Sequence, residues 1–431
     1  MKRLILCFSI FAITCSLLPA CSARVQVGAE QTADYLPLLK DKRVALFSNH
    51  TGIVDDKHTL DILVGNSVNV TAIFSPEHGF RGTAGAGDHV ASSVDEKTGV
   101  PILSLYDKGS YAPSAESMQQ FDILVVDIQD VGLRFYTYYI SMVRLMAACA
   151  DCSKPVIILD RPNPNGFYVD GPVLDMKFKS GVGWLPIPVV HGMTLGELAL
   201  MVNGEHWLPD GKQCELTVIP CRNYTHQTRY RLPVPPSPNL RNMLAVYLYP
   251  SMCYFEATPV SLGRGTDLPF LCYGHPDYKI SNSLNFKHST LNYISFTPRS
   301  MTSAPKPPCQ DRLCYGVDLS HMSEEEAMNL GLDLTFLIDA YNNLMATHDT
   351  INSPRLADRE SEANKELSTS FNSQLSTLNP FFSPFFEKLI GVDYVRPMIE
   401  AGKSAEEIRA CWQQDVESFK IQRRPYLLYK E

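Results

Sequence analysis

The sequence predicts an α/β fold in which a doubly wound, mostly parallel sheet is followed by a second, smaller α+β domain. Five short runs rich in Val, Ile and Leu lie between residues 40 and 162, and few of them alternate polar with apolar residues. Such continuous runs are typical of parallel strands that are buried on both faces. Helix-like segments separate the runs, which indicates helices packed on both sides of one sheet.

The predicted elements follow one another at short intervals. After residue 172 the sequence becomes richer in proline and less regular. Capping boxes, in which Ser or Thr precedes Glu by three residues, predict helices that begin after Thr194, Ser323 and Ser404. A stretch over 296–309 that is dense in Pro and Ser predicts a loop. We expect strands over 43–49, 68–75, 101–106, 121–130 and 155–161, and helices over 59–64, 114–120 and 138–150.

Length and composition are those of a globular protein. The chain has 431 residues, of which 45% are hydrophobic and 19% charged. This length suggests two domains, which we place at 25–240 and 241–431. The net charge of −8 gives no general attraction to nucleic acid or anionic lipid, so we expect no nucleic-acid partner. An anionic ligand would have to be held by Arg residues placed locally.

The N-terminus has the pattern of an export signal. Lys2 and Arg3 precede an apolar run, and small residues follow it. We assign residues 1–20 to a signal peptide and expect an exported protein, in the periplasm or anchored to the membrane through a lipidated Cys21. Ordinary cleavage near Ala23 is the alternative to the lipoprotein signal. No later run reaches the roughly 20 apolar residues that a spanning helix needs.

Nine cysteines lie in the body of the chain. The pairs Cys309–Cys314 and Cys214–Cys221 could close short loops, but the sequence leaves the pairing open. The CxxC spacing at 149–152 has neither a second such pair nor a nearby His, so we interpret it as a coincidence at a helix end. Glycine-rich nucleotide-binding motifs are also missing. We therefore expect no metal and no cofactor.

Polar residues gather where the predicted strands end. In an open parallel sheet, ligands bind beyond the carboxyl ends of the strands, so these residues are candidates for a site. The alternative is that they are polar only because loops are polar. They are Asn49 and His50 after the first strand, Glu77 and His78 after the second, Asp127, Gln129 and Asp130 after the fourth, and Asp160 and Arg161 after the fifth.

The densest of these clusters lies at residues 75–82. Pro76 and two glycines predict a tight loop, which would hold Glu77, His78 and Arg81 in fixed positions. The alternative is that Glu77 only pairs with Arg81 at the surface.

Basic and aromatic residues follow the fourth strand. Arg134 and Tyr136 come shortly after Asp130. Aromatic rings stack on sugar faces, whereas acids and Arg hydrogen-bond to hydroxyl and carboxylate groups. Packing of the next helix is the alternative role for Tyr136. Asp160 and Arg161 could likewise form a purely structural pair.

Further candidates lie later in the chain. His191 precedes a helix N-terminus, where a neutral imidazole or an anionic ligand would be well placed, although a lone His is more often satisfied within the fold. Asn239 ends a Pro-rich segment, and Glu256 begins the last cluster. Two glycines flank Arg264, which suits a backbone that approaches a ligand while the Arg side chain reaches it.

Together these motifs resemble the exo-β-N-acetylmuramidase family of bacterial glycosidases, from about Arg43 to the C-terminus. The resemblance implies a Rossmann-like catalytic domain over 25–240 and a C-terminal domain over 241–431 that closes an active-site cleft. It is carried by FSPEHGFRG (74–82), DIQDVGLRFYTY (127–138), DRPNPNG (160–166), HGMTLGELA (191–199), PPSPN (235–239) and FEATPVSLGRGTDLPF (255–270).

The resemblance also implies the reaction. It is an exo-acting hydrolysis that releases β-1,4-linked N-acetylmuramic acid from the non-reducing end of peptidoglycan fragments, with Glu77 as the catalytic glutamate by motif match. We expect Glu77 to act as general acid with a raised pKa. His78 or Asp127 would orient it or serve as the complementary acid or base. The substrate's own acetamido group is another candidate for that second role, so the stereochemical outcome stays open.

Muramic acid carries a lactyl carboxylate, so a selective site should offer a cation. Among the arginines near the motifs we favour Arg134 and Arg264. The alternative function is an envelope lipoprotein that binds muropeptides without cleaving them. A metal-dependent amidase or deacetylase is disfavoured, because the sequence shows no convincing ligand triad. The predicted substrate-binding residues are Asn49, Arg81, Asp130, Arg134, Tyr136, Asp160, Arg161, His191, Asn239, Glu256 and Arg264.

Overall fold

The computed structural model describes residues 24–76, 80, 93–105, 113–280, 292–351 and 381–431. Its larger sheet consists of β1 (Arg43–Ser48), β4 (Asn69–Ser75), β5 (Ser93–Val94), β6 (Pro101–Ser104), β7 (Ile123–Asp127), β8 (Val156–Leu159) and β9 (Leu216–Ile219). The strand order is β5-β6-β4-β1-β7-β8-β9, and only the edge strand β5 pairs antiparallel. Along the chain, the six parallel strands thus have the Rossmann order, which reverses between β1 and β7. The predicted doubly wound sheet is confirmed.

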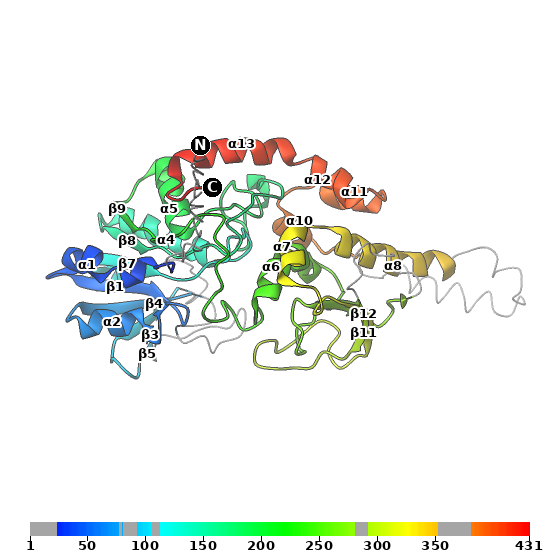
Figure 1. Ribbon diagram of the computed structural model, residues 1–431, viewed down its shortest axis with the longest axis horizontal. Coiled ribbons are helices and arrows are strands. Elements are labelled where there is room, and N and C mark those ends of the chain that lie inside the picture. The colour runs from blue at the N-terminus through cyan, green and yellow to red at the C-terminus, as the bar shows by residue number, and fades with distance from the viewer. Residues whose placement is uncertain (1–23, 77–79, 81–92, 106–112, 281–291, 352–380) are drawn as a thin grey trace, which may run out of the picture.

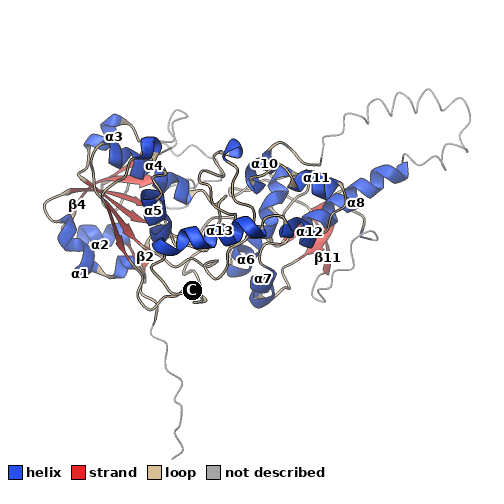
Figure 2. Ribbon diagram, turned by 90° about the horizontal axis from the view of Figure 1, so that it is seen from above, coloured by secondary structure: helices blue, strands red, loops and turns tan. Residues whose placement is uncertain are grey.

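The four central strands of the sheet, β4, β1, β7 and β8, are buried on both faces, whereas the edge strand β5 is exposed. In β1, Val44 and Leu46 belong to one apolar core, and Ala45 and Phe47 belong to the other. Figure 2 shows the sheet edge-on, with helices on either side of it. The first core is covered by α1 (Thr32–Tyr35) and α2 (Thr59–Gly65), the second by α3 (Ala115–Gln119), α4 (Tyr138–Asp151) and α5 (Leu195–Gly204).

A second, smaller sheet lies apart from the first (Figure 1). It is antiparallel, with the order β10-β12-β11, and its strands are β10 (Cys272–His275), β11 (Asn292–Phe296) and β12 (Cys314–Asp318). Helices accompany it, so the predicted α+β character of this part is confirmed. They are α6 (Met243–Met252), α7 (Glu324–Leu330), α8 (Thr335–Ile351), α10 (Phe385–Ile390), α11 (Val395–Glu400) and α12 (Ala405–Ala410).

The local signals in the sequence are reproduced closely. Thr194, Ser323 and Ser404 each close a capping box at the start of a helix. The predicted loop over 296–309 begins at the last residue of β11, Phe296, and continues toward β12 with no further helix or strand. The run over 121–130 forms a strand only as far as Asp127, because the backbone N–H of Gln129 donates to the hydroxyl of Thr51 in a loop instead of joining a neighbouring strand.

The last helix, α13 (Gln413–Arg423), leads the chain from the second part back to the first. In Figure 1 it lies along the top of the molecule, and the C-terminus reaches α5. The hydroxyl of Tyr429 donates to Asp160 over 2.6 Å, and the backbone N–H of Leu428 donates to Glu197 over 2.8 Å. The final residues therefore complete the polar interior of the first domain.

The predicted signal segment, residues 1–20 with Cys21, lies outside the described residues. Within the part of the chain that the structure does describe, no helix combines the length and hydrophobicity needed to cross a membrane. The nine cysteines of the body all carry free thiols.

Candidate functional site

Two buried charges meet where the strand order of the large sheet reverses. Arg161, which follows β8, donates from Nε and Nη2 to the two carboxylate oxygens of Asp127 over 2.6 and 3.0 Å. The hydroxyl of Thr59 donates to the same carboxylate. Burial alone would lower the pKa of Arg161, but the charge of Asp127 outweighs it and holds the pKa above its ordinary value. Both oxygens of Asp127 are thus occupied by groups of the protein.

The potential pair between Asp160 and Arg161 does not form. Neighbouring residues at a strand end point to opposite faces of the sheet, so the two side chains have different surroundings. Asp160 accepts hydrogen bonds from the Thr194 hydroxyl, the Gly196 N–H and the Tyr429 hydroxyl, at 2.6–2.8 Å. Burial raises the pKa of Asp160 to about 6. These contacts join α5 and the C-terminal tail to the sheet, so Asp160 has a structural role.

A network of short polar side chains lies beside the Asp127–Arg161 pair. The amide oxygen of Asn49 accepts from the hydroxyl of Thr51 over 2.6 Å, and Nε2 of His50 contacts the carbonyl of Pro235 over 2.9 Å. The amide nitrogen of Asn49 and the amide oxygen of Gln129 are buried, and no atom of the described residues hydrogen-bonds to either. Buried polar groups of this kind are usually paired. The amide nitrogen of Asn49 can therefore donate, and the amide oxygen of Gln129 can accept, a hydrogen bond with a ligand or with a residue outside the described ranges.

Asp130 is nearly enclosed and only half satisfied. One carboxylate oxygen accepts the N–H of Gly132 over 2.8 Å, and the other has no hydrogen-bond partner among the residues described. Burial raises the pKa of Asp130 to about 7. A carboxyl group with a pKa near neutrality can give or take a proton at the pH at which most enzymes work.

The residues Glu77, His78 and Arg81 lie outside the described part of the structure. The strand that leads to them, β4, ends at Ser75 and pairs in parallel with β1. Asn49 directly follows β1. The chain therefore enters the predicted catalytic segment at the edge where the polar network of Asn49 lies.

A small pocket brings four predicted binding residues together. Its volume is about 140 Å³, and it lies where the segment before α4 meets α6 and the short helix η6 (Cys253–Ala257). This volume is small beside the roughly 300–1,000 Å³ of pockets for drug-sized ligands, so it suits a single sugar or part of one. The lining residues are Phe135, Tyr136, Thr137, Tyr138, Val182, Ser237, Asn239, Leu240, Tyr249, Glu256, Arg264 and Phe270.

The pocket contains one ion pair among aromatic rings. Nη2 of Arg264 lies 2.6 Å from Oε1 of Glu256, and both side chains remain about one-quarter exposed, at 20% and 27%. The guanidinium also lies over the ring of Phe270. Burial lowers the pKa of Arg264, but the Glu256 carboxylate outweighs this and raises it above its ordinary value. The pocket thus offers a fixed positive charge that a ligand carboxylate could share.

The glycines that flank Arg264 are needed for contacts within the chain. Gly263 and Gly265 both have positive φ, at 82° and 81°. A Cβ on Gly263 would meet the carbonyl of Leu268 at 2.1 Å, and one on Gly265 would meet the carbonyl of Arg299 at 2.6 Å. The sequence predicted that the backbone here approaches a ligand, but the glycines instead let it approach other loops of the protein. This close packing fixes the backbone of Arg264.

Two further pocket residues were not predicted from the sequence, and one predicted residue had two alternative roles. Tyr249 of α6 and Phe270 line the pocket, and their rings meet edge to face with centroids 5.0 Å apart. A Tyr in an apolar helix gives no sign of its own that it faces a pocket. Tyr136 serves both roles that were considered, because it lines the pocket and its hydroxyl donates to the carbonyl of Pro236 over 2.8 Å.

Arg134 is placed differently from Arg264. It is fully buried, and its terminal nitrogens donate to backbone carbonyls of both halves of the chain. A guanidinium that is enclosed and bonded in this way is not placed to receive a lactyl carboxylate, so the preference for Arg134 as the substrate cation is not supported. The accepting carbonyls are those of Pro172, Ile187, Leu389 and Ile390.

His191 is buried at the start of the segment that leads to α5. Its Nδ1 accepts the N–H of Met193 over 3.2 Å, which leaves the proton on Nε2, and Nε2 has no partner in the described ranges. Burial lowers the pKa of His191 to about 3. The imidazole is thus neutral, and it is not among the residues that line the small pocket.

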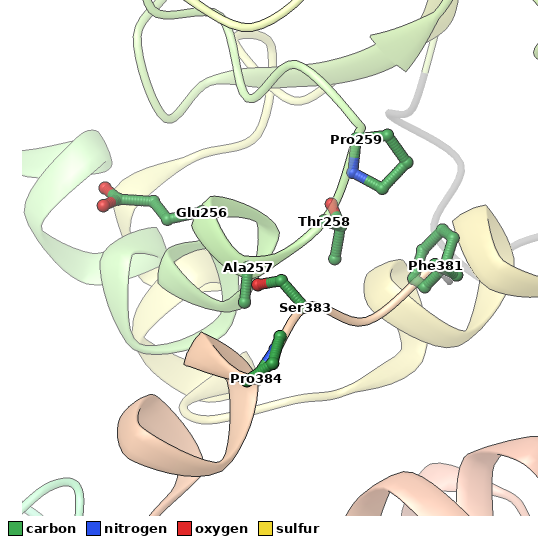
Figure 3. A pocket seen from close by; sticks show the side chains of 7 residues that line it. All are labelled: Glu256, Ala257, Thr258, Pro259, Phe381, Ser383 and Pro384. Carbon is green, nitrogen blue, oxygen red and sulfur yellow. The ribbon is translucent and has the colours of Figure 1, made fainter. Parts of the chain in front are cut away.

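A second hollow, of about 390 Å³, lies between the end of η6 and the segment over 381–384 (Figure 3). Glu256 borders both hollows, and in Figure 3 its carboxylate points away from Phe381 and Ser383. The carboxylate therefore serves the small pocket. In neither hollow, nor elsewhere in the described ranges, do three or more His, Cys, Asp or Glu residues gather in a way that could hold a metal ion.

Fold and pocket together define a class of protein. A two-domain α/β protein with a small pocket that combines tyrosine rings with an Arg and a carboxylate has the features of a protein that binds a small polar ligand.

Comparison with known proteins gives the family. Residues 44–244 match the model "Exo-beta-N-acetylmuramidase NamZ, N-terminal", and residues 247–429 match the corresponding C-terminal model. The chain belongs to the NamZ family of glycosidases. It is 36% identical to the peptidoglycan β-N-acetylmuramidase NamZ of Bacillus subtilis (strain 168) over 422 residues, which cover 94% of this chain and 92% of that protein.

Two solved structures resemble this one. Both are crystal structures of DUF1343 family proteins from Bacteroides fragilis NCTC 9343. The first is 59% identical, with a TM-score of 0.78, and the match covers 95% of this chain and 100% of the other. The second is 27% identical, with a TM-score of 0.75, and covers 94% and 99%. The resemblance that the motifs indicated is thus confirmed over both domains.

Proposed function

We propose that the protein is an exo-acting glycoside hydrolase that releases β-1,4-linked N-acetylmuramic acid from the non-reducing end of peptidoglycan fragments. The observation that carries this proposal is the match to the NamZ family over both domains. The small pocket supports it, because about 140 Å³ suits one terminal sugar better than a run of sugars.

In this proposal Glu77 is the general acid that protonates the departing glycosidic oxygen. Support comes from the position of β4, whose end at Ser75 lies next to β1 and the polar network of Asn49. This is the crevice in which doubly wound sheets bind their ligands. Asp127 is bonded to Arg161 and Thr59, so it serves to hold the crevice together. Asp130, whose pKa is raised to about 7, becomes a second candidate for proton transfer.

The lactyl carboxylate of the substrate would bind to Arg264. In the free protein this guanidinium faces Glu256 at 2.6 Å, and its remaining N–H groups can bind a second carboxylate. A charge-assisted hydrogen bond of this kind contributes about 1.5–3 kcal/mol. It would favour muramic acid over sugars that lack the lactyl group. We also propose that the protein is exported, with Cys21 as the site of a lipid anchor.

The decisive experiment compares the parent protein with Glu77→Gln on a disaccharide that carries β-1,4-linked N-acetylmuramic acid at its non-reducing end, because a sugar leaving group needs the proton whereas an aryl leaving group does not. We expect turnover by the parent and a loss of at least about 100-fold in kcat for the variant, as is usual when a general acid is removed. Glu215→Gln, which changes an exposed Glu far along the chain, is the matched control. Recording the anomer of the first product would assign a retaining or an inverting outcome.

The alternative, a lipoprotein that binds muropeptides without cleaving them, predicts a different result. The parent would then bind N-acetylmuramic acid tightly in calorimetry but release no free sugar from the disaccharide. Full turnover by Glu77→Gln would instead overturn the role proposed for Glu77 and leave the enzymatic function standing.

A further inference from the structure

One amide that lines the small pocket is hydrogen-bonded through its nitrogen, while its oxygen has no partner among the described residues. Asn239 lines the pocket and is only 3% exposed. Its amide nitrogen donates to the backbone carbonyl of Ser303 over 2.8 Å. Its amide oxygen is buried and accepts no hydrogen bond from any residue that the structure describes.

The direction of this amide is fixed by its neighbour. A backbone carbonyl can only accept hydrogen bonds, so the atom of Asn239 that faces Ser303 must be the nitrogen. The oxygen is therefore left on the opposite side of the amide. Leaving a buried acceptor without a donor costs about 1–3 kcal/mol. Such a cost is recovered when a ligand supplies the missing N–H or O–H group.

The loop that holds the amide is itself ordered. Ser303 lies in a turn in which Met301 and Ala304 exchange backbone hydrogen bonds of 3.1 and 2.8 Å. This turn belongs to the Pro-rich loop between β11 and β12. The loop thus sets the orientation of Asn239 before any ligand arrives.

We propose that the amide oxygen of Asn239 accepts the N–H of the substrate's 2-acetamido group and so makes the pocket selective for N-acetylated muramic acid. The proposal rests on the function proposed above. An amide N–H can only donate, and the unpaired amide oxygen of Asn239 can only accept, so the two groups match. Leu240, Val182 and Phe270 line the same pocket and offer apolar contact to the acetyl methyl group.

The test measures discrimination between two substrates. Asn239→Ala and Asn239→Leu are assayed on a chromogenic β-N-acetylmuramide and on the analogue with an acetoxy group in place of the acetamido group, which has no N–H to donate. We expect kcat/KM for the N-acetylated substrate to fall at least about tenfold, while that for the analogue changes less than about threefold, because only the former loses a hydrogen bond. Asn239→Leu keeps most of the side-chain volume, so it separates the lost hydrogen bond from an empty space.

Asn343 provides a matched control. It is also a buried Asn in the second half of the chain, but its amide oxygen accepts the N–H of Lys279 and its amide nitrogen donates to the Lys279 carbonyl, both over 2.8 Å. Asn343→Ala should lower stability and leave the discrimination between the two substrates unchanged. Equal losses on both substrates in the Asn239 variants, or no loss at all, would overturn the proposal.

A binding measurement separates this proposal from the proposed reaction. Calorimetry with N-acetylmuramic acid and with its 2-O-acetyl analogue, which lacks the N–H donor, needs no turnover. If the parent cleaves no muramide but binds the N-acetylated sugar at least about tenfold more tightly, and Asn239→Leu abolishes that preference, the proposed function fails and the role of Asn239 stands. If the parent binds both sugars equally, the role of Asn239 fails whatever the turnover.

Discussion

Asp127 and Arg161 form a two-point ion pair in the interior of the first domain, with N–O distances of 2.6 and 3.0 Å and both side chains at most 2% exposed. The pair joins the end of β7 to the second residue after β8. It therefore fixes the spacing of the strand ends around the crevice into which the predicted catalytic segment leads.

Removing one partner of this pair should be costly. Arg161→Ala leaves the Asp127 carboxylate buried without its cation, and we expect the free energy of unfolding to fall by about 3–5 kcal/mol. Urea unfolding measures the change. Arg43→Ala is the control, because Arg43 pairs with Asp122 at the surface, where both side chains are over 40% exposed. Its loss should cost far less than the loss of Arg161, because solvent screens an exposed pair. Equal effects of the two changes would contradict the importance of the buried pair.

Asp130 should make the stability of the protein depend on pH. Its pKa is about 7 in the folded protein against 3.8 in a free side chain, so the folded state holds the proton more tightly. The resulting stabilisation is complete below pH of about 4 and is lost as the pH rises through about 7. Asp130→Asn cannot ionise, so its free energy of unfolding should fall less between pH 5 and pH 8, by on the order of 2 kcal/mol.

The control for this change is Asp55→Asn, because the side chain of Asp55 is 75% exposed. Its pH dependence should match that of the parent. Parallel pH profiles of Tm for the parent and Asp130→Asn would show that Asp130 does not take up a proton on folding.

Arg264 should distinguish muramic acid from glucosamine. With Arg264→Ala, we expect the ratio of kcat/KM on β-N-acetylmuramide to that on β-N-acetylglucosaminide to fall by about tenfold or more, because the contact with the lactyl carboxylate is lost. Arg231→Ala, at a surface arginine 69% exposed, should leave the ratio unchanged. If Arg264→Ala keeps the parent's ratio, a residue other than Arg264 binds the lactyl carboxylate.

Cys309 and Cys314 should be the first cysteines to form a disulfide. The thiol of Cys314 is the main cause of the lowered pKa of Cys309, so the two thiols are in contact. A thiolate attacks an oxidised thiol more readily than a neutral thiol does. Treatment with a mild disulfide oxidant should link the pair, with loss of two titratable thiols and of two hydrogen atoms by mass spectrometry. Cys309→Ser should prevent this, whereas Cys152→Ser should not.

The sequence predicted much of the fold because the relevant signals are local. The strand runs and the capping boxes at Thr194, Ser323 and Ser404 act over a few residues, and nothing distant overrides them. The different roles of Arg134 and Arg264, in contrast, could not be predicted from local signals. The carbonyls of Leu389 and Ile390, which enclose Arg134, lie more than 250 residues away in the chain. No local pattern contains that information, so the two arginines looked equivalent.

For the same reason, the sequence did not identify the partner of Arg161. Asp160 is adjacent in sequence, but the alternation of side chains along a strand separates the two. The true partner, Asp127, comes from the neighbouring strand, 34 residues earlier. Pairing across a sheet depends on strand order, which the sequence indicated only through the overall fold class.

The return of α13 and the tail to the first domain has a consequence for how the protein unfolds. Asp160 and Glu197 receive hydrogen bonds from Tyr429 and Leu428, more than 230 residues later in the chain. The first domain thus depends on a segment from which the whole second part separates it in sequence. The two parts should therefore lose their structure in one cooperative transition and not in two steps.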